Sequence, residues 1–234
     1  MSHEALVERL FDTLVSGNRQ AVRAFVSEVC SRGMTPEALI SDVFWPTYTM
    51  IDTMHRKDQM TTIAHHMATR LLRVMVDQAA LRLTQQPSNN RRVFAVCGPQ
   101  DPDELGAQMA VDLLEASGFT VTFAGGGVAS DEILAQVQET QPDVLLLFAS
   151  APSDLPGIRA MIDQINEIGA VRNLQIVVGG GVFNRAKGLA EEIGADLWAE
   201  NPSELVHNML NQPQRRAAPA QQSVGKKRKL RSAA

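Results

Sequence analysis

The sequence has few cysteines and no long apolar run, and both shortages narrow the class of protein. Only Cys30 and Cys97 occur among 234 residues, and both fall inside apolar patterns, so we expect buried free thiols and no disulfide framework. No apolar run approaches the roughly 18 residues that span a bilayer, and the first residues lack the basic-then-apolar build of a signal peptide. The sequence therefore predicts a cytoplasmic globular protein with no membrane segment.

Phosphate-binding motifs and a catalytic set are also missing. No Gly-x-Gly-x-x-Gly follows the first predicted strand and no Gly-Lys-Ser or Gly-Lys-Thr loop occurs, which disfavours dinucleotides and nucleoside triphosphates as ligands. Ser150 and Ser153 have no histidine near them in the pattern, and helix capping explains Asp103 better than acid–base catalysis does. We therefore expect no catalytic activity of the chain's own.

The net charge of −4 is distributed unevenly. After Pro213 the chain has seven cations and no acid, which leaves −11 for the rest. This segment is rich in Gln, Ala and Pro and poor in bulky apolar residues, so we predict that residues 213–234 are disordered. Its Lys226-Lys227-Arg228-Lys229 cluster predicts weak contact with nucleic acid, with a purely solubilising tail as the alternative.

The first third of the chain has the apolar spacing of helices throughout. Apolar residues recur every three or four positions in four successive segments, the last a long helix from Gln59 to Leu83. Pro46 predicts a break or kink in the third segment. We therefore predict a four-helix bundle as a cap domain over residues 1–84 and a polar linker over residues 85–91.

From about Arg92 to Gln212, strand and helix patterns alternate. Parallel strands with helices on both faces form the doubly wound class, so the predicted fold is α/β, a helical bundle followed by a flavodoxin-like, five-stranded parallel sheet over residues 92–212. The predicted strands are Val93–Cys97, Thr120–Ala124, Val144–Ala149, Gln175–Val178 and Asp196–Ala199, and the predicted helices are Glu104–Ser117, Ser130–Thr140, Asp154–Ile168 and Ala186–Ile193.

The carboxyl ends of these strands are the expected ligand edge. Each end meets a small-residue or turn-rich segment, and glycines there let a ligand approach the backbone; tight turns are the simpler interpretation of each glycine run alone. The loop after the first strand, residues 98–103, leads into a helix at this edge. We therefore expect this loop to carry much of the domain's specificity.

Three histidines are the unusual feature of the bundle. On a wheel of 100° per residue, His65 and His66 point away from the apolar stripe, which consists of Met60, Ile63, Met67, Leu71, Val74 and Met75. His55 lies one short turn-like segment earlier, so the sequence predicts that three imidazoles gather on one surface. Two interpretations stay open: a solvated polar face, or a surface that covers a ligand held by the second domain.

Several motifs coincide with those of one known family. They are Asp101, Leu105 and Gly106 in a loop like Asp-x-His-x-x-Gly, Pro156, Gly179-Gly180-Gly181-Val182, Gly194-Ala195-Asp196 and Glu200, together with residues 58–69, which are similar to a stretch ending in Glu-His-x-Ala-Ser/Thr. Over roughly residues 36–210 the chain resembles the cobalamin-binding module. That module, a helical cap followed by a flavodoxin-like domain, occurs in methionine synthase, corrinoid methyl-carrier proteins and cobalamin-dependent photoreceptor regulators.

The chain departs from the family's pattern at three places. Asp103 stands where the family has the histidine that binds cobalt from below, and a carboxylate suits cobalt less well than imidazole does. Phe148-Ala149-Ser150 stands where Ser-x-Leu is expected, which predicts a phenyl ring in part of the slot for the nucleotide tail. Above the cofactor, His55 replaces the family's tryptophan and His65-His66 replaces its Glu-His.

The resemblance implies a tetrapyrrole, cobalamin or alternatively haem, held between cap and sheet. The leading prediction is a sensor or regulatory protein; the alternatives are a corrinoid carrier for methyl transfer, against which Asp103 argues, and a degenerate module without cofactor that acts by protein contacts. Implied partners are the tetrapyrrole and a protein partner or a second copy bound through the bundle. The implied cofactor-binding residues are His55, His65, His66, Asp101, Asp103, Gly106, Phe148, Ser150, Gly179, Gly180 and Gly181, of which the three histidines are the implied metal ligands.

Overall fold

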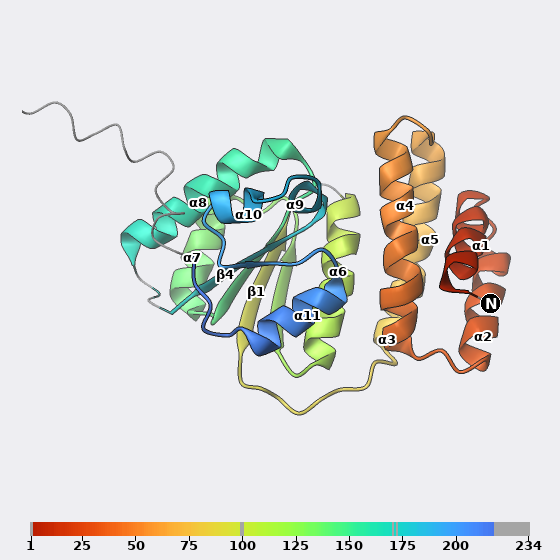
Figure 1. Ribbon diagram of the computed structural model, residues 1–234, viewed down its shortest axis with the longest axis horizontal. Helices are drawn as coiled ribbons and strands as arrows, with labels where there is room; N and C mark the ends of the chain where they lie inside the picture. The colour runs from red at the N-terminus through yellow and green to blue at the C-terminus, as the bar shows by residue number, and fades with distance from the viewer. Residues whose placement is uncertain (1, 99–100, 170, 172, 218–234) are drawn as a thin grey trace, which may run out of the picture.

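A helical bundle and a five-stranded sheet lie side by side in the computed structural model (Figure 1). The structure describes residues 2–98, 101–169, 171 and 173–217, without the side chains of residues 101–103. The fold class is α/β, with an N-terminal helical bundle and a flavodoxin-like parallel sheet, as predicted. Among the described residues, no helix has the length and apolar character needed to cross a membrane.

Four helical rods form the bundle. Each begins at a polar residue whose side chain accepts a hydrogen bond from a backbone N–H of the first turn, which satisfies a donor that the helix leaves free. These N-cap residues are Ser2, Asn18, Thr35 and Thr61. The rods are α1 (His3–Val15), α2 (Arg19–Ser31), a continuous third rod of α3 (Pro36–Ala38), η1 (Leu39–Phe44) and α4 (Trp45–Arg56), and finally α5 (Thr62–Ala80).

The third rod contains a π-helix instead of the break predicted at Pro46. Proline has no amide hydrogen to donate to the preceding turn. Over η1 each hydrogen-bonded turn contains one residue more than in an α-helix, so that the Trp45 N–H donates to the carbonyl of Ile40, five residues earlier. The rod therefore continues past Pro46 without interruption. π-helical turns are frequent at functional sites, and this one sets the orientation of the following α4.

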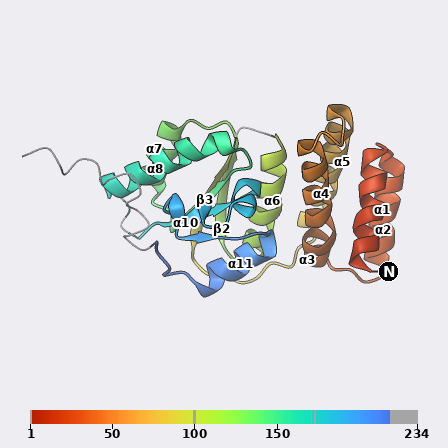
Figure 2. The ribbon, with the colours of Figure 1, turned by 45° about the horizontal axis from the view of Figure 1, so that its top comes forward.

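The sheet is entirely parallel, in the order β2-β1-β3-β4-β5. Alternate residues of each strand pack on opposite faces, against α6 and α11 on one side and against α7, α8 and α10 on the other (Figure 2). The strands are β1 (Arg92–Cys97), β2 (Thr120–Gly125), β3 (Val144–Phe148), β4 (Gln175–Gly179) and a two-residue β5 (Leu197–Trp198). The helices are α6 (Asp101–Ala116), α7 (Ser130–Thr140), η2 (Pro152–Asp154), α8 (Leu155–Ile168), α9 (Gly181–Arg185), α10 (Leu189–Glu192) and α11 (Pro202–Asn211).

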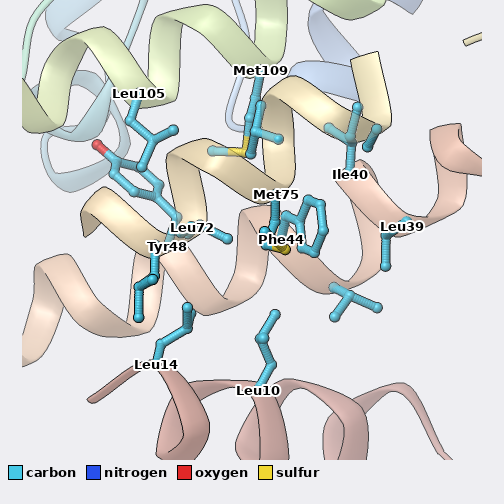
Figure 3. Packing of buried hydrophobic residues seen from close by; sticks show 14 of the residues in the cluster. Leu10, Leu14, Leu39, Ile40, Phe44, Tyr48, Leu72, Met75, Leu105 and Met109 are labelled. Carbon is cyan, nitrogen blue, oxygen red and sulfur yellow. The ribbon is translucent and has the colours of Figure 1, made fainter. Parts of the chain in front are cut away.

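The bundle and α6 share one hydrophobic core. Leu105 and Met109 of α6 reach toward Tyr48, Leu72 and Met75 of the bundle (Figure 3). Residues 85–91, predicted as a linker, are also held in place, because backbone N–H groups at 86 and 89 donate to carbonyls of the turn after α6. The division into a cap domain over 1–84 and a second domain over 92–212 therefore stays a prediction.

The prediction of disorder from residue 213 onward is wrong for the first residues of the tail. The N–H of Ala217 donates to Asp196 at 2.6 Å, and the guanidinium of Arg216 donates to the carbonyl of Asn173 at 2.6 Å. These bonds dock residues 213–217 beside the amino ends of the strands. Residues 218–234, including the predicted nucleic-acid contact at Lys226–Lys229, lie outside the described residues. The two cysteines are free, as predicted, but only partly buried.

Candidate functional site

The candidate site lies at the carboxyl edge of the sheet, where β1 and β3 are neighbours. The chain leaves these two strands in opposite directions, toward α6 on one face and toward η2 and α8 on the other, which opens a crevice at the strand ends. Cys97 pairs with Phe148 at the last register position, and the Gly98 N–H donates to the carbonyl of Phe148 at 2.9 Å. Figure 1 shows α4 and α5 extending past the upper end of α6, so the bundle overhangs this edge.

One face of α4 forms the wall opposite the strand ends. Trp45, Tyr48, Thr49 and Asp52 recur at helical spacing and line a cavity of about 40 Å³. The π-helix before Trp45 fixes the rotation of α4 and thus the direction in which this face points. The other lining residues are Gly106, Ala107, Phe148, Ser150, Gly180, Gly181 and Asn184, five of which are predicted site residues.

Gly106 permits the close approach of α4 to α6. A Cβ at this position would lie 3.1 Å from Oη of Tyr48 and 3.2 Å from its Cε1, closer than ordinary packing allows. Gly180 has a different role: its φ of +102° and the carbonyl of Ala149, which would lie 2.3 Å from a Cβ, both require glycine. Glycine is therefore needed at 106 because the Tyr48 ring lies against it, and at 180 because the Ala149 backbone does.

Phe148 separates two cavities. Its side chain lines the small cavity beneath α4 and also a larger one, of about 310 Å³, between the sheet and α7 and α8. Its ring packs against Gly179, where a Cβ would lie 3.0 Å from Cε1. The residues that share the larger cavity are Val96, Cys97, Gly98, Gly127, Val128, Ser130, Ile133, Leu147, Asp154, Gly157, Ile158 and Met161.

The three predicted histidines lie together at the upper end of the bundle. The ring of His55, on α4, stacks on His65, on α5, with centroids 3.9 Å apart and planes 20° apart. The ring of His66 lies 5.8 Å from that of His65. Three imidazoles from two helices thus form one cluster, which we name the imidazole cluster.

The predicted orientation of His65 is wrong. His65 is 3% exposed and lies on the buried face of α5, with Ala68, whereas Ile63 is 72% and Met67 39% exposed. Ile63 is left exposed in the first turn of α5, and Met67 lies against Gly17, where a Cβ would be 3.2 Å from its Sδ. His66 is exposed and His55 is partly buried.

His65 is held in its neutral form. Burial, together with the neighbouring His55 and His66, lowers its pKa from 6.5 to about 4. Its Nδ1 is buried and has no hydrogen-bond partner. A neutral imidazole with an unpaired ring nitrogen is the form that binds metals. Within the described residues, no group of three or more His, Cys, Asp or Glu side chains is arranged to hold a metal ion.

The imidazole cluster continues into a polar network between the bundle and α6. His66 and Arg73 are seven residues apart on α5 and thus share a helix face. Arg73 donates to Gln108 at 3.2 Å, lies 3.8 Å from Glu104, and Gln108 donates to Asp77 at 2.6 Å. His66 lies two turns N-terminal to Arg73 on this face of α5, and Glu104 is in the first turn of α6.

The remaining site residues are of two kinds: two that were predicted but whose side chains are not described, and three that were not predicted. The side chains of Asp101 and Asp103 lie outside the described residues, so their predicted roles stay predictions. The sequence analysis missed Trp45, Tyr48 and Arg56. Their spacing along one face of α4 was visible in the sequence, but that face could not be assigned to the site before the bundle was docked on α6.

Comparisons with known proteins agree on the family. A family described as "B12 binding domain" matches residues 91–206, and a second family of the same description matches residues 6–79. The chain is 24% identical to dimethylamine corrinoid protein 1 of Methanosarcina acetivorans over 208 residues, 88% of this chain and 96% of that protein. It is 31% identical to dimethylamine corrinoid protein 3 of Methanosarcina mazei over 106 residues, 45% of this chain and 62% of that protein.

The fold agrees as well. The structure of the Methanosarcina barkeri monomethylamine corrinoid protein matches 90% of this chain and 99% of its own length, with a TM-score of 0.77 and 16% sequence identity. The chain therefore belongs to the cobalamin-binding module family, and cobalamin is its cofactor. The site fits this cofactor, since it offers glycine-lined strand ends and a cavity on each side of Phe148, and the adjoining bundle has an imidazole nitrogen without a hydrogen-bond partner.

Proposed function

We propose that this protein is a corrinoid carrier, which holds cobalamin between the bundle and the carboxyl edge of the sheet and presents it to a protein partner. The proposal is the alternative of the sequence analysis, and it replaces the sensor as the leading interpretation. The observation that carries it is the match along 96% of the length of a dimethylamine corrinoid protein. In this class of protein, bound cobalamin supplies a cobalt centre that can take up and release a methyl group.

The larger cavity is assigned to the nucleotide tail. Its volume of about 310 Å³ and its mainly apolar walls suit an aromatic base. Phe148 stands at its entrance, so its ring would contact the tail rather than occupy the whole slot, which refines the prediction made from Phe148-Ala149-Ser150. The chain's part in function is to bind this tail and to orient the corrin above the strand ends.

The imidazole cluster is assigned to the upper side of the cofactor. No histidine occurs in residues 98–106, so the first loop offers no imidazole from below. The three rings lie together at the end of the bundle, and Nδ1 of His65 has no hydrogen-bond partner. We therefore infer that one of His55, His65 and His66 would bind the cobalt whenever no methyl group occupies that side.

A cobalamin sensor is the second candidate function. The substitution of Asp103 for the family's histidine, together with three imidazoles above the site, favours it, because both changes alter how the cofactor's axial ligands respond to their surroundings. The two candidates differ in what the protein does when the upper ligand changes. A carrier keeps its shape, whereas a sensor changes its association state or the docking of its bundle.

Reconstitution tests the shared part of the proposal. The protein is incubated with hydroxocobalamin or with haem, freed of excess ligand, and its absorption spectrum is recorded. We expect stoichiometric retention of cobalamin and none of haem; a protein that retains no corrinoid would refute the assignment. Size-exclusion chromatography of the hydroxo-, methyl- and adenosylcobalamin forms, in the dark and after illumination, then separates the candidates, because only a sensor should elute at different positions.

A further inference from the structure

Two arginine side chains converge on one backbone carbonyl at the edge of the candidate site. Arg56, in the last turn of α4, donates from Nη1 to the carbonyl of Ser150 at 3.2 Å. Arg185, in the last turn of α9, donates from Nη2 to the same oxygen at 2.5 Å. One arginine therefore comes from the bundle and the other from the sheet, and they meet above the end of β3.

The two guanidinium groups also lie close to each other. A Cβ placed on Gly181 would be 2.7 Å from Nη1 of Arg185 and 3.0 Å from Nη2 of Arg56, so glycine at this position leaves room for both. Arg56 forms an ion pair with Asp52, one turn earlier on α4. Arg185 has no ion pair with a carboxylate among the described residues.

A neutral carbonyl is a weak acceptor for two cations. Asp52 offsets the charge of Arg56, but in the part of the chain that the structure describes Arg185 has only the carbonyl oxygen, which carries a partial negative charge. A phosphate oxygen carries more charge, and the planar fork of a guanidinium matches two phosphate oxygens at once. We therefore expect a phosphate oxygen to bind these two guanidinium groups more strongly than the Ser150 carbonyl does.

The position of the pair indicates which anion this is. Ser150 and Gly181 line the cavity beneath α4, and Phe148 lines both this cavity and the one assigned to the nucleotide tail. A ligand that fills both cavities must pass the end of β3, beside the arginines. In cobalamin, the segment that joins the corrin to the base contains a phosphodiester, the one anionic group of that segment.

We propose that Arg56 and Arg185 bind the phosphodiester of the nucleotide tail and make the protein select complete cobalamin over cobinamide, the corrinoid that lacks phosphate, ribose and base. This inference rests on the proposed cobalamin site. Arg56 belongs to the bundle, so its contact with the bound tail would also hold the bundle against the edge of the sheet. Asp52 orients Arg56 for this contact from the preceding turn.

The test compares two corrinoids on three proteins. Dissociation constants of hydroxocobalamin and of aquacobinamide are measured by absorbance titration for the wild type, for the Arg56→Gln/Arg185→Gln double variant and for Arg9→Gln. Arg9 is the matched control, since its guanidinium is ion-paired with Glu28 on the outside of the bundle. Circular dichroism melts of all three proteins establish that the variants are folded.

We expect the double variant to lose roughly tenfold to a hundredfold in affinity for cobalamin and to keep its affinity for cobinamide within about twofold, because charge-assisted hydrogen bonds to the phosphate contribute about 1.5–3 kcal/mol. Lysines at both positions should restore part of the loss, and Arg9→Gln should change neither constant. Equal loss for both corrinoids, or no loss, overturns the inference and leaves the cobalamin site standing. A wild type that binds neither corrinoid overturns the proposed function itself.

Discussion

The bundle meets α6 in two ways along the same interface. Along most of α6 the contact is apolar and closed, and Met109, at its centre, has no exposed surface. Past the first turn of α6 the bundle projects beyond its neighbour; this end carries the imidazole cluster, and Arg56 reaches the end of β3 there. The helices α4 and α5 therefore form both the part of the bundle that packs on α6 and the part that faces the ligand.

The difference separates stability from binding in space. Apolar burial supplies the main free energy that holds the two halves together, and it needs no polar partner. The projecting end contains an unpaired buried nitrogen, stacked imidazoles and paired cations, which cost free energy in the absence of a ligand. We infer that the apolar contact with α6 stabilises the fold enough to offset the cost of these groups, and that a bound ligand removes this cost.

The largest effect is expected at the closed part. Met109→Ala removes a fully buried side chain from the shared core and should lower the free energy of unfolding by about 2–5 kcal/mol, the usual range for such a change in a core. Met67→Ala is the matched control, because Met67 is 39% exposed and should change stability by less than about 1 kcal/mol. Urea unfolding of both variants checks this, and equal losses would show that the bundle does not depend on α6.

The next effect concerns His65 and acid. Its pKa is about 4 in the folded protein and 6.5 in the unfolded chain, so the unfolded chain takes up a proton first as the pH falls. Stability should therefore drop by about 2–3 kcal/mol between pH 6.5 and pH 4, and this residue contributes no pH dependence above that window. His65→Gln should remove that part of the drop. A variant with the same slope as the wild type in urea unfolding at several pH values would contradict the assignment.

Asp112, at the far end of the same interface, should respond to pH with the opposite sign. Burial raises its pKa to about 7, with help from Glu115 and Asp77, and its Oδ2 has no partner. The cost of burying the charge is full above pH 7 and is relieved as the pH falls toward 3.8. Asp112→Asn should therefore stabilise the protein by about 2 kcal/mol at pH 8, after allowance for solvent screening, and by nothing at pH 4. Unfolding at the two pH values checks this, and a gain that persists at pH 4 would rule out relief of charge as its cause.

The sheet could be predicted from the sequence because its signals are local. Runs such as Val144–Ala149 and Gln175–Val178 are apolar on both faces and end in small residues, which is typical of central parallel strands. The crevice followed from strand order, since Gly98 and Ser150 stand at the ends of neighbouring strands. The clustering of the histidines also followed from their closeness in the sequence on either side of one turn.

The rest of the site depends on contacts that the sequence does not mark. The wheel of α5 placed Ile63 on the apolar stripe and His65 opposite it, whereas the packing of the bundle leaves Ile63 exposed and buries His65. Arg56 and Arg185 meet at Ser150 across 94 and 35 residues of chain. Such pairs need the docking of α4 against the sheet edge, which no periodicity reveals.

The smallest change in stability is expected for the exposed imidazoles, and it distinguishes the two parts of the interface most directly. His66 is exposed and His55 partly buried, so His55→Ala/His66→Ala should alter the free energy of unfolding of the ligand-free protein by about 0.5 kcal/mol or less. The same variant should bind hydroxocobalamin more weakly or with shifted absorption bands, because an axial imidazole is a direct bond to the metal. Adding His65→Ala should lower stability further, since that ring is buried, but the spectral change identifies the ligand. If all three alanines leave the spectrum of the bound cobalamin unchanged at full occupancy, the cluster contributes no axial ligand, and the overhanging end of the bundle serves only to cover the cofactor.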